Sequence, residues 1–211
     1  DEANVANAKA QLLTPIAKAF VTDTSLEACI AGQQVLGGHG YVREWGQEQL
    51  VRDCRITQIY EGTNGVQALD LMGRKVAMDG GKTLNLLIDE ILAFSLENQS
   101  VNGEMMKQLN DSAILLKEVT TSVLDEASRD KNALGAASVD FLHLCGYVFY
   151  GYMWAKMVVA SKEEGVEQTL ATSKQKTATY YFARLLPKIH SLKQQIESGA
   201  ELLFEFTADE I

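Results

Sequence analysis

Proline is nearly absent from this chain: Pro15 and Pro187 are the only two in 211 residues. Proline interrupts helices, and folds built from short β-strands need frequent turn residues between the strands. Much of the remaining sequence consists of Ala, Leu, Glu, Lys and Gln, which favour helices. These features predict an all-α protein, and the length allows one large domain or two small ones.

Residues 1–80 are predicted to form three helices, of which the first begins at Thr14 and Pro15. Thr14 has the residue type of an N-cap, and Pro15 suits the first helical position. Apolar residues at loosely helical spacing continue this helix for about two dozen residues, up to Gly37 and Gly38. Its apolar stripe is Ile16, Phe20, Leu26, Ile30 and Val35.

A second, shorter helix is expected within EWGQEQLVRDCRIT, and a third begins near Asn64. Asn64 and Gln67 have the spacing of a capping box at the start of that third helix. Its apolar side is predicted to contain Val66, Leu69 and Met72, and the helix runs toward Gly80-Gly81.

A second bundle is predicted after Gly80-Gly81. The sequence indicates helices at roughly 82–97, 104–131, 134–163 and 166–204. Pro187 should bend or break the last of them, and FLHLCGYVFYGYMWAKMVVA is apolar nearly all round, as in a helix buried on most sides. Short connections favour an up-and-down bundle. We therefore expect a boundary near residue 80, with domains at 1–80 and 81–211.

Charge, cysteine content and hydropathy limit the function classes. A net charge of −9 argues against nucleic acid as a partner, because phosphate binding relies on clustered Lys and Arg. Cys29, Cys54 and Cys145 are odd in number and widely spaced, which suits neither a disulfide framework nor a metal site and favours a reducing compartment. No apolar run reaches the ~18 residues of a membrane span, and no signal peptide opens the chain.

The glycine-rich stretch QQVLGGHGY, residues 33–41, has two explanations. Glycine turns can approach phosphates closely because they lack Cβ and expose backbone N–H groups. This turn follows a helix instead of a strand and lacks the lysine of a P-loop, which excludes the Rossmann and Walker motifs. On the residues alone, a double-glycine helix stop is the more common explanation.

Histidines and aromatic residues of the chain receive no chemical role from their sequence context. His39 has no nearby Ser or Cys nucleophile, and no pair of His or Cys has the spacing of a zinc site. His143 and His190 have the surroundings of structural histidines. The aromatic residues from Tyr147 to Trp154 have helical spacing, which favours core packing over a cofactor site.

Glu61 lies between an apolar approach, Ile59 and Tyr60, and a turn that begins with Gly62 and Thr63. The apolar neighbours can remove water from one side, and the free N–H groups of the next helix could hold an oxygen or phosphate. Burial would raise the pKa of this glutamate and make it a usable base. On spacing alone, a solvated loop glutamate is the more frequent case.

Two motifs in the correct order carry a family resemblance. A Q-x-x-G-G-x-G-[YF] turn is followed by R-D-x-[RK]-I-x-x-I-Y-E-G-T, and together they resemble the last three helices of the acyl-CoA dehydrogenase fold over roughly residues 10–78. The remainder, with YYFARLLPKIH, resembles the C-terminal helical extension of a bacterial branch that includes 3-methylmercaptopropionyl-CoA dehydrogenases. The resemblance implies a bacterial cytoplasmic enzyme that uses FAD.

The resemblance also implies a role for each matching residue. Glu61 falls on the catalytic base, which removes the α-proton of an acyl-CoA thioester while the β-hydrogen leaves as hydride to FAD, in a dry site. Tyr60 and Gly62 fall on positions that line the thioester end of the pocket. The positions for FAD contact are Gln34, Gly37 and Gly38, in a turn that reaches the neighbouring subunit's cofactor, and Thr63 beside the base.

The resemblance further implies partners and leaves alternatives open. Expected partners are the acyl-CoA substrate, an electron-transfer flavoprotein and a second copy in a homodimer. The extension should pack against the 15–78 helices and away from the active site. The family's N-terminal and middle domains have no counterpart in this sequence, so we expect a fragment that is inactive alone. Gly65 departs from relatives that carry a longer polar residue there. An acyl-CoA oxidase and a non-catalytic helical assembly module are the alternatives.

Overall fold

The computed structural model describes residues 2–207, 209 and 210, and this part of the chain contains helices and no strand, as predicted. The α-helices are α1 (Glu2–Val35), α2 (Gly38–Tyr41), α3 (Gln47–Thr57), α4 (Asn64–Leu69), α5 (Lys82–Glu97), α6 (Gly103–Ala127), α7 (Asn132–Ala160), α8 (Gln168–Arg184) and α9 (Lys188–Glu197). A π-helical turn, Asp70–Val76, and a 3-10 turn, Ala77–Asp79, extend α4. Further 3-10 turns are Arg43–Trp45 and Glu201–Phe204.

Helix α1 has 34 residues, so the prediction that it begins at Thr14 is wrong. The Thr14 hydroxyl does not cap a helix start, because it donates a hydrogen bond to the Ala10 carbonyl at 2.8 Å, one turn back. Leu12, ahead of the predicted start, is buried in the core. Packing of that first part keeps the chain helical through Pro15, at the cost of one backbone hydrogen bond.

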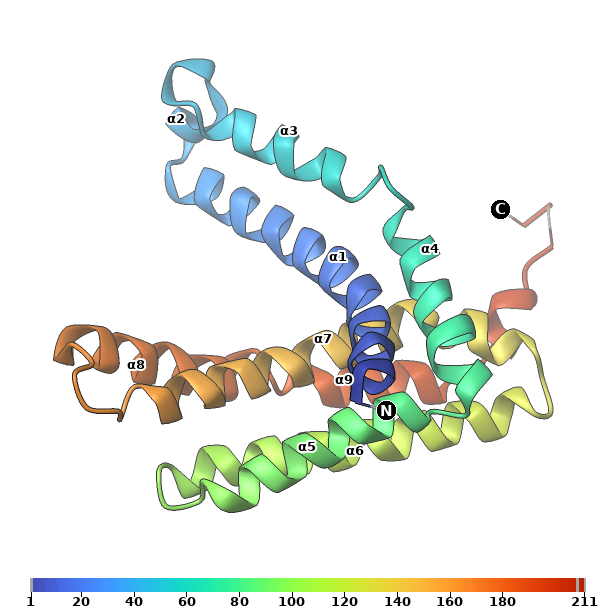
Figure 1. Ribbon diagram of the computed structural model, residues 1–211. Coiled ribbons are helices and arrows are strands. Elements are labelled where there is room, and N and C mark those ends of the chain that lie inside the picture. Colours follow the sequence, from blue (N-terminus) through green and yellow to red (C-terminus); the bar gives the residue numbers. More distant parts are fainter. Residues whose placement is uncertain (1, 208, 211) are drawn as a thin grey trace.

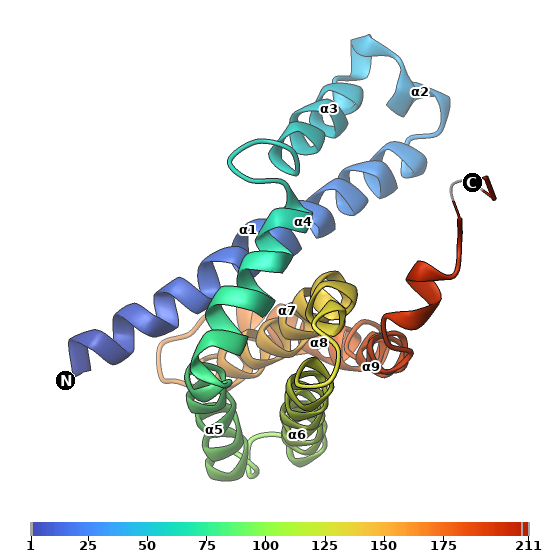
Figure 2. The same ribbon diagram turned by 90° about the vertical axis from the view of Figure 1, so that its right-hand side faces the viewer.

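The second half of α1 pairs with α3 and projects away from the other helices, with α2 at its tip (Figures 1 and 2). We call residues 29–57 the arm. The predicted apolar stripe of α1 is divided by this arrangement, because Phe20 is buried against the bundle whereas Ile30 and Val35 in the arm are 48% and 86% exposed. No residue of α3 is buried.

Helices α5 to α9 form the expected bundle, with α7 at its centre and α6, α8 and α9 packed on it (Figure 2). Pro187 breaks the last segment as predicted, since α8 ends at Arg184 and α9 begins at Lys188. The prediction that no apolar stretch is long enough to span a membrane is wrong for α7, which passes by length and composition, but 61% of its apolar 18-residue window is buried inside the protein. Packing in the bundle therefore accounts for its apolar sequence.

One continuous core joins α1 and α4 to the bundle. Helix α7 approaches α1 closely at Gly146, where an added Cβ would overlap the ring of Phe20. Gly80 and Gly81 turn the chain between the two parts with φ of 67° and 77°. The division at residue 80 therefore falls at a turn, but the two parts share a core, and the division into domains stays a proposal.

Candidate active-site loop

Glu61 lies in the loop that connects α3 to α4, and the two ends of this loop are joined by a hydrogen bond. The backbone N–H of Asn64 donates to the carbonyl oxygen of Gln58 at 3.2 Å, which joins the two ends. Between them, Glu61 has φ of 54° and is the one non-glycine residue with positive φ among the described residues. A side chain in this left-handed region costs energy, and such strain is found preferentially at functional sites.

The start of α4 differs from the predicted capping box. Thr63 is the N-cap, and its hydroxyl oxygen accepts from the backbone N–H of Val66 at 3.4 Å. The side chain of Gln67 instead donates to the Glu61 carbonyl at 3.1 Å. The side chain of Asn64 does not cap the helix, because its amide is hydrogen-bonded to Lys18 and Asp23 of α1. The predicted apolar side is also wrong in part, since Met72 is buried while Val66 and Leu69 are exposed.

The predicted dry environment of Glu61 is not found among the described residues. Glu61 is exposed, and its apolar neighbours Ile59 and Tyr60 are 46% and 51% exposed. These two side chains therefore face solvent. The chain by itself therefore supplies the backbone geometry of Glu61 but not its cover.

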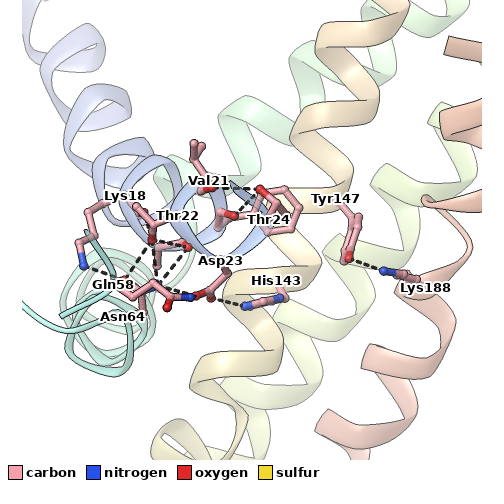
Figure 3. A network of polar contacts seen from close by, with 12 residues as sticks. Lys18, Val21, Thr22, Asp23, Thr24, Gln58, Asn64, His143, Tyr147 and Lys188 are labelled. Carbon is pink, nitrogen blue, oxygen red and sulfur yellow. Dashed lines mark hydrogen bonds and ion pairs between the residues drawn. The ribbon is translucent and has the colours of Figure 1, made fainter. Parts of the chain in front are cut away.

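Asp23 of α1 holds both ends of the Glu61 loop (Figure 3). Its Oδ1 atom accepts hydrogen bonds from the side-chain amides of Gln58 and Asn64, each at 2.6 Å. Its Oδ2 atom lies 3.0 Å from Nε2 of His143 on α7. Burial alone would raise the pKa of Asp23, but the hydrogen bonds from His143, Asn64 and Gln58 hold it below its ordinary value. The ionised carboxylate can only accept, so His143 carries a hydrogen on Nε2.

Lys18 braces the same loop from one turn earlier on α1. Its Nζ atom donates to the Gly62 carbonyl at 2.8 Å and to Oδ1 of Asn64 at 2.7 Å. The Asn64 amide therefore receives a cation at its oxygen and faces the carboxylate of Asp23 with its nitrogen. These two charged partners fix the orientation of that amide.

The glycine turn lies at the far end of the arm from this loop. The turn carries Gln34, Gly37 and Gly38, which are all exposed, and a Cβ added at either glycine would meet nothing within 4 Å. The 11 residues of α3 separate the turn from the loop, which corresponds to about 16 Å along the helix axis. The structure thus brings Tyr60, Glu61, Gly62 and Thr63 together and keeps Gln34, Gly37 and Gly38 apart from them.

Sequence reasoning missed Asp23 and the pairing of two cysteines. The polar run Thr22 to Ser25 interrupts an apolar helix and is the signal that could have identified Asp23. The Sγ atoms of Cys29 on α1 and Cys54 on α3 lie 3.2 Å apart, although 25 residues separate them in sequence. Such a pair becomes visible only when the arm is folded.

Comparisons with known proteins identify the relatives of this chain. Residues 2–76 match the family described as acyl-CoA dehydrogenase, C-terminal domain, and residues 87–207 match the one described as acetyl-CoA dehydrogenase C-terminal like. A 3-methylmercaptopropionyl-CoA dehydrogenase from Ruegeria pomeroyi is 31% identical over 94% of this chain and 35% of that protein. A broad-specificity linear acyl-CoA dehydrogenase, FadE5, from Mycobacterium tuberculosis is 28% identical over 89% and 33%, respectively.

A third relative matches a shorter part of the chain. Subunit CarC of a caffeyl-CoA reductase-Etf complex from Acetobacterium woodii is 40% identical over 58 residues, 28% of this chain and 15% of that protein. The chain spans about a third of the length of the two dehydrogenases above. With one family description matching most of the first helices and the other matching the bundle, the chain belongs to the acyl-CoA dehydrogenase family.

Proposed function

We propose that this chain carries the C-terminal part of an FAD-dependent acyl-CoA dehydrogenase in which Glu61 is the catalytic base. The observation that carries the proposal is the backbone of Glu61, which is held at positive φ in a loop braced at both ends. A solvated loop glutamate with no role would not need this conformation, because glycine adopts it without strain. The family membership supplies the reaction class.

In this proposal Glu61 removes the α-proton of an acyl-CoA thioester. An exposed carboxylate is a weak base toward such a carbon acid, so the site must be dry when the reaction occurs. Tyr60 and Gly62, on either side of the base, would line the thioester end of the pocket. The remaining cover would come from the substrate and from parts of a longer enzyme, as the partial coverage of the relatives suggests.

The residues assigned to FAD fit such a cofactor. When bound, FAD accepts the β-hydrogen as hydride. Gly37 and Gly38 leave open space beside the backbone, which allows the close approach of a large ligand. The Thr63 hydroxyl accepts one bond and can still donate another. Because α3 separates this turn from Glu61, we propose that Gln34, Gly37 and Gly38 serve the cofactor of a neighbouring subunit, in a homodimer.

An electron-transfer flavoprotein is the proposed acceptor, in a bacterial cytoplasmic pathway. The match to a subunit of an Etf complex supports this choice over oxygen. Acyl-chain length is a separate question, because the two dehydrogenase relatives act on different acyl groups by name.

Purification of the intact enzyme that contains this chain tests the proposal. We expect a bound flavin spectrum and reduction of the flavin by an acyl-CoA. An electron-transfer flavoprotein should then reoxidise the reduced flavin much faster than air does. Fast reoxidation by oxygen would favour the acyl-CoA oxidase alternative. A folded enzyme without flavin would contradict the proposal and favour the helical assembly module.

A further inference from the structure

The Asp23 carboxylate connects three separate elements at one point (Figure 3). Gln58 follows the last turn of α3, Asn64 begins α4, and His143 lies in the middle of α7. All three side chains point toward the same carboxylate, which is 24% exposed. Hydrogen bonds to an ionised acceptor are shorter and stronger than those between neutral groups, so this contact is a strong polar link between the loop and α1, beside the one made by Lys18.

The two residues that Asp23 binds through Oδ1 stand at the two ends of the loop: Gln58 is its first residue, and Asn64 directly follows it as the first residue of α4. The same pair is joined by the backbone hydrogen bond from Asn64 to Gln58. A single carboxylate oxygen therefore fixes the separation of the two loop ends, while Lys18 fixes the Gly62 carbonyl between them. Strained backbone conformations persist only where the surroundings over-determine them, and these contacts meet that condition for Glu61.

His143 brings the C-terminal bundle into this arrangement. It lies on α7, packs edge-to-face against Phe20 with ring centroids 5.7 Å apart, and holds Oδ2 of Asp23. The expectation that the extension packs away from the active site stays a prediction, but one α7 side chain supports the carboxylate that holds the ends of the loop. The reason is the close approach of α7 to α1 beside Gly146.

We propose that Asp23, oriented by His143, is a positioning residue that holds the Glu61 loop in its reactive geometry. The role of Glu61 itself rests on the proposed function above. Asp23 does not touch substrate in this account: it acts through Gln58 and Asn64. Loss of the carboxylate leaves two half-buried amide groups without their charged acceptor and lets the loop ends separate. Misplacement of a reacting group by about 1 Å can lower a rate about 100-fold.

Hydrogen exchange on the 211-residue chain tests the link between Asp23 and the loop without any assay of activity. The backbone amides of Tyr60 and Asn64 are hydrogen-bonded in the loop and should be protected. Asp23→Ala should accelerate their exchange about tenfold or more, while amides in α6 stay unchanged. Asp111→Ala, an exposed aspartate on α6, is the matched control and should leave the loop unchanged. Equal exchange in both variants would overturn the proposal.

His143→Asn and His190→Asn form the second matched pair. Loop exchange should accelerate in His143→Asn, by less than in Asp23→Ala because the two bonds to Oδ1 remain. His190 lies on α9, away from the loop, and His190→Asn should have no effect there. If both histidine variants behave alike, His143 does not orient Asp23.

Steady-state kinetics of the intact enzyme separate positioning from general stability. Asp23→Ala should lower kcat by about 10- to 100-fold with KM for the acyl-CoA within about threefold. Asp23→Asn should recover much of kcat, because its amide oxygen still accepts from Gln58 and Asn64. A loosened loop with normal kcat would overturn the positioning role. Failure of the base assignment gives a different pattern, in which Glu61→Gln remains active while the loop exchange still responds to Asp23→Ala.

Discussion

Gly146 sits where α7 crosses α1, and its replacement by alanine should destabilise the protein. A Cβ at this position would overlap Cγ and Cδ2 of the Phe20 ring. Phe20 is buried, and the rings of His143, Tyr147 and Tyr150 contact it edge-on with centroids 4.9 to 5.7 Å away. These three aromatic neighbours therefore restrict the movement of the Phe20 ring.

The magnitude follows from two opposing terms. Overpacking of a core costs about 1–3 kcal/mol, and the enclosed Phe20 ring places this site at the upper end. Replacement of a helical glycine by alanine returns about 1 kcal/mol through helix propensity. We expect a net loss of about 2 kcal/mol in the free energy of unfolding, or about 4–8 °C in Tm for a chain of this size.

Gly151 provides the control on the same helix. An alanine Cβ there would meet Leu186, Phe182 and Tyr181 at ordinary distances of 3.6 to 3.7 Å. Gly151→Ala should therefore be neutral or stabilising by up to about 1 kcal/mol. Urea unfolding followed by circular dichroism measures both variants, and equal stabilities would refute the close packing of α1 on α7. Phe20→Leu should relieve part of the cost of Gly146→Ala, which a double-mutant cycle detects.

Three further perturbations test separate parts of the structure. Hydrogen bonds hold the pKa of Asp23 below its ordinary value, so its stabilisation is complete above about pH 4 and is lost as the pH falls through the folded-state pKa. In Asp23→Asn the free energy of unfolding, measured with urea, should fall less steeply at acid pH than in the wild type. Parallel falls in the two proteins would contradict this role of Asp23. Glu61→Gly should raise the free energy of unfolding by up to about 1 kcal/mol, because glycine tolerates φ of 54°; a lower stability would argue against strain at this residue. Diamide should oxidise Cys29 and Cys54 to a disulfide and accept their two hydrogens, because their Sγ atoms lie 3.2 Å apart. The buried Cys145 should not react. Peptide mapping that finds Cys29 and Cys54 as free thiols would contradict this geometry.

The helices could be predicted from sequence because each depends mainly on local residues. The predicted ends of α5 to α9 lie within a few residues of the observed ones. The signals were the helical spacing of Leu and Ala, the glycine pair and Pro187. The predicted start of α1 was wrong because the local cap signal at Thr14 competed with burial of Leu12. Tertiary packing outweighs a cap, which contributes about 1 kcal/mol.

The sequence predicted which residues belong to the candidate site but not how they are arranged in space. The motif identified Glu61 and its neighbours, whereas its positive φ and its exposure depend on the folded loop. Asp23 lies 35 residues from Gln58 and 120 from His143 in sequence. No spacing rule joins such distant residues, because their contact arises only when α1, α3 and α7 pack together.

The base assignment of Glu61 is tested most directly by flavin reduction in the intact enzyme. Wild type and Glu61→Gln are mixed with an acyl-CoA under anaerobic conditions, and flavin absorbance is followed with time. The amide has nearly the shape of the carboxylate but cannot take the proton, so the variant should bind FAD and acyl-CoA normally and lose flavin reduction. Reduction at the wild-type rate in Glu61→Gln would contradict the role of Glu61 as the base.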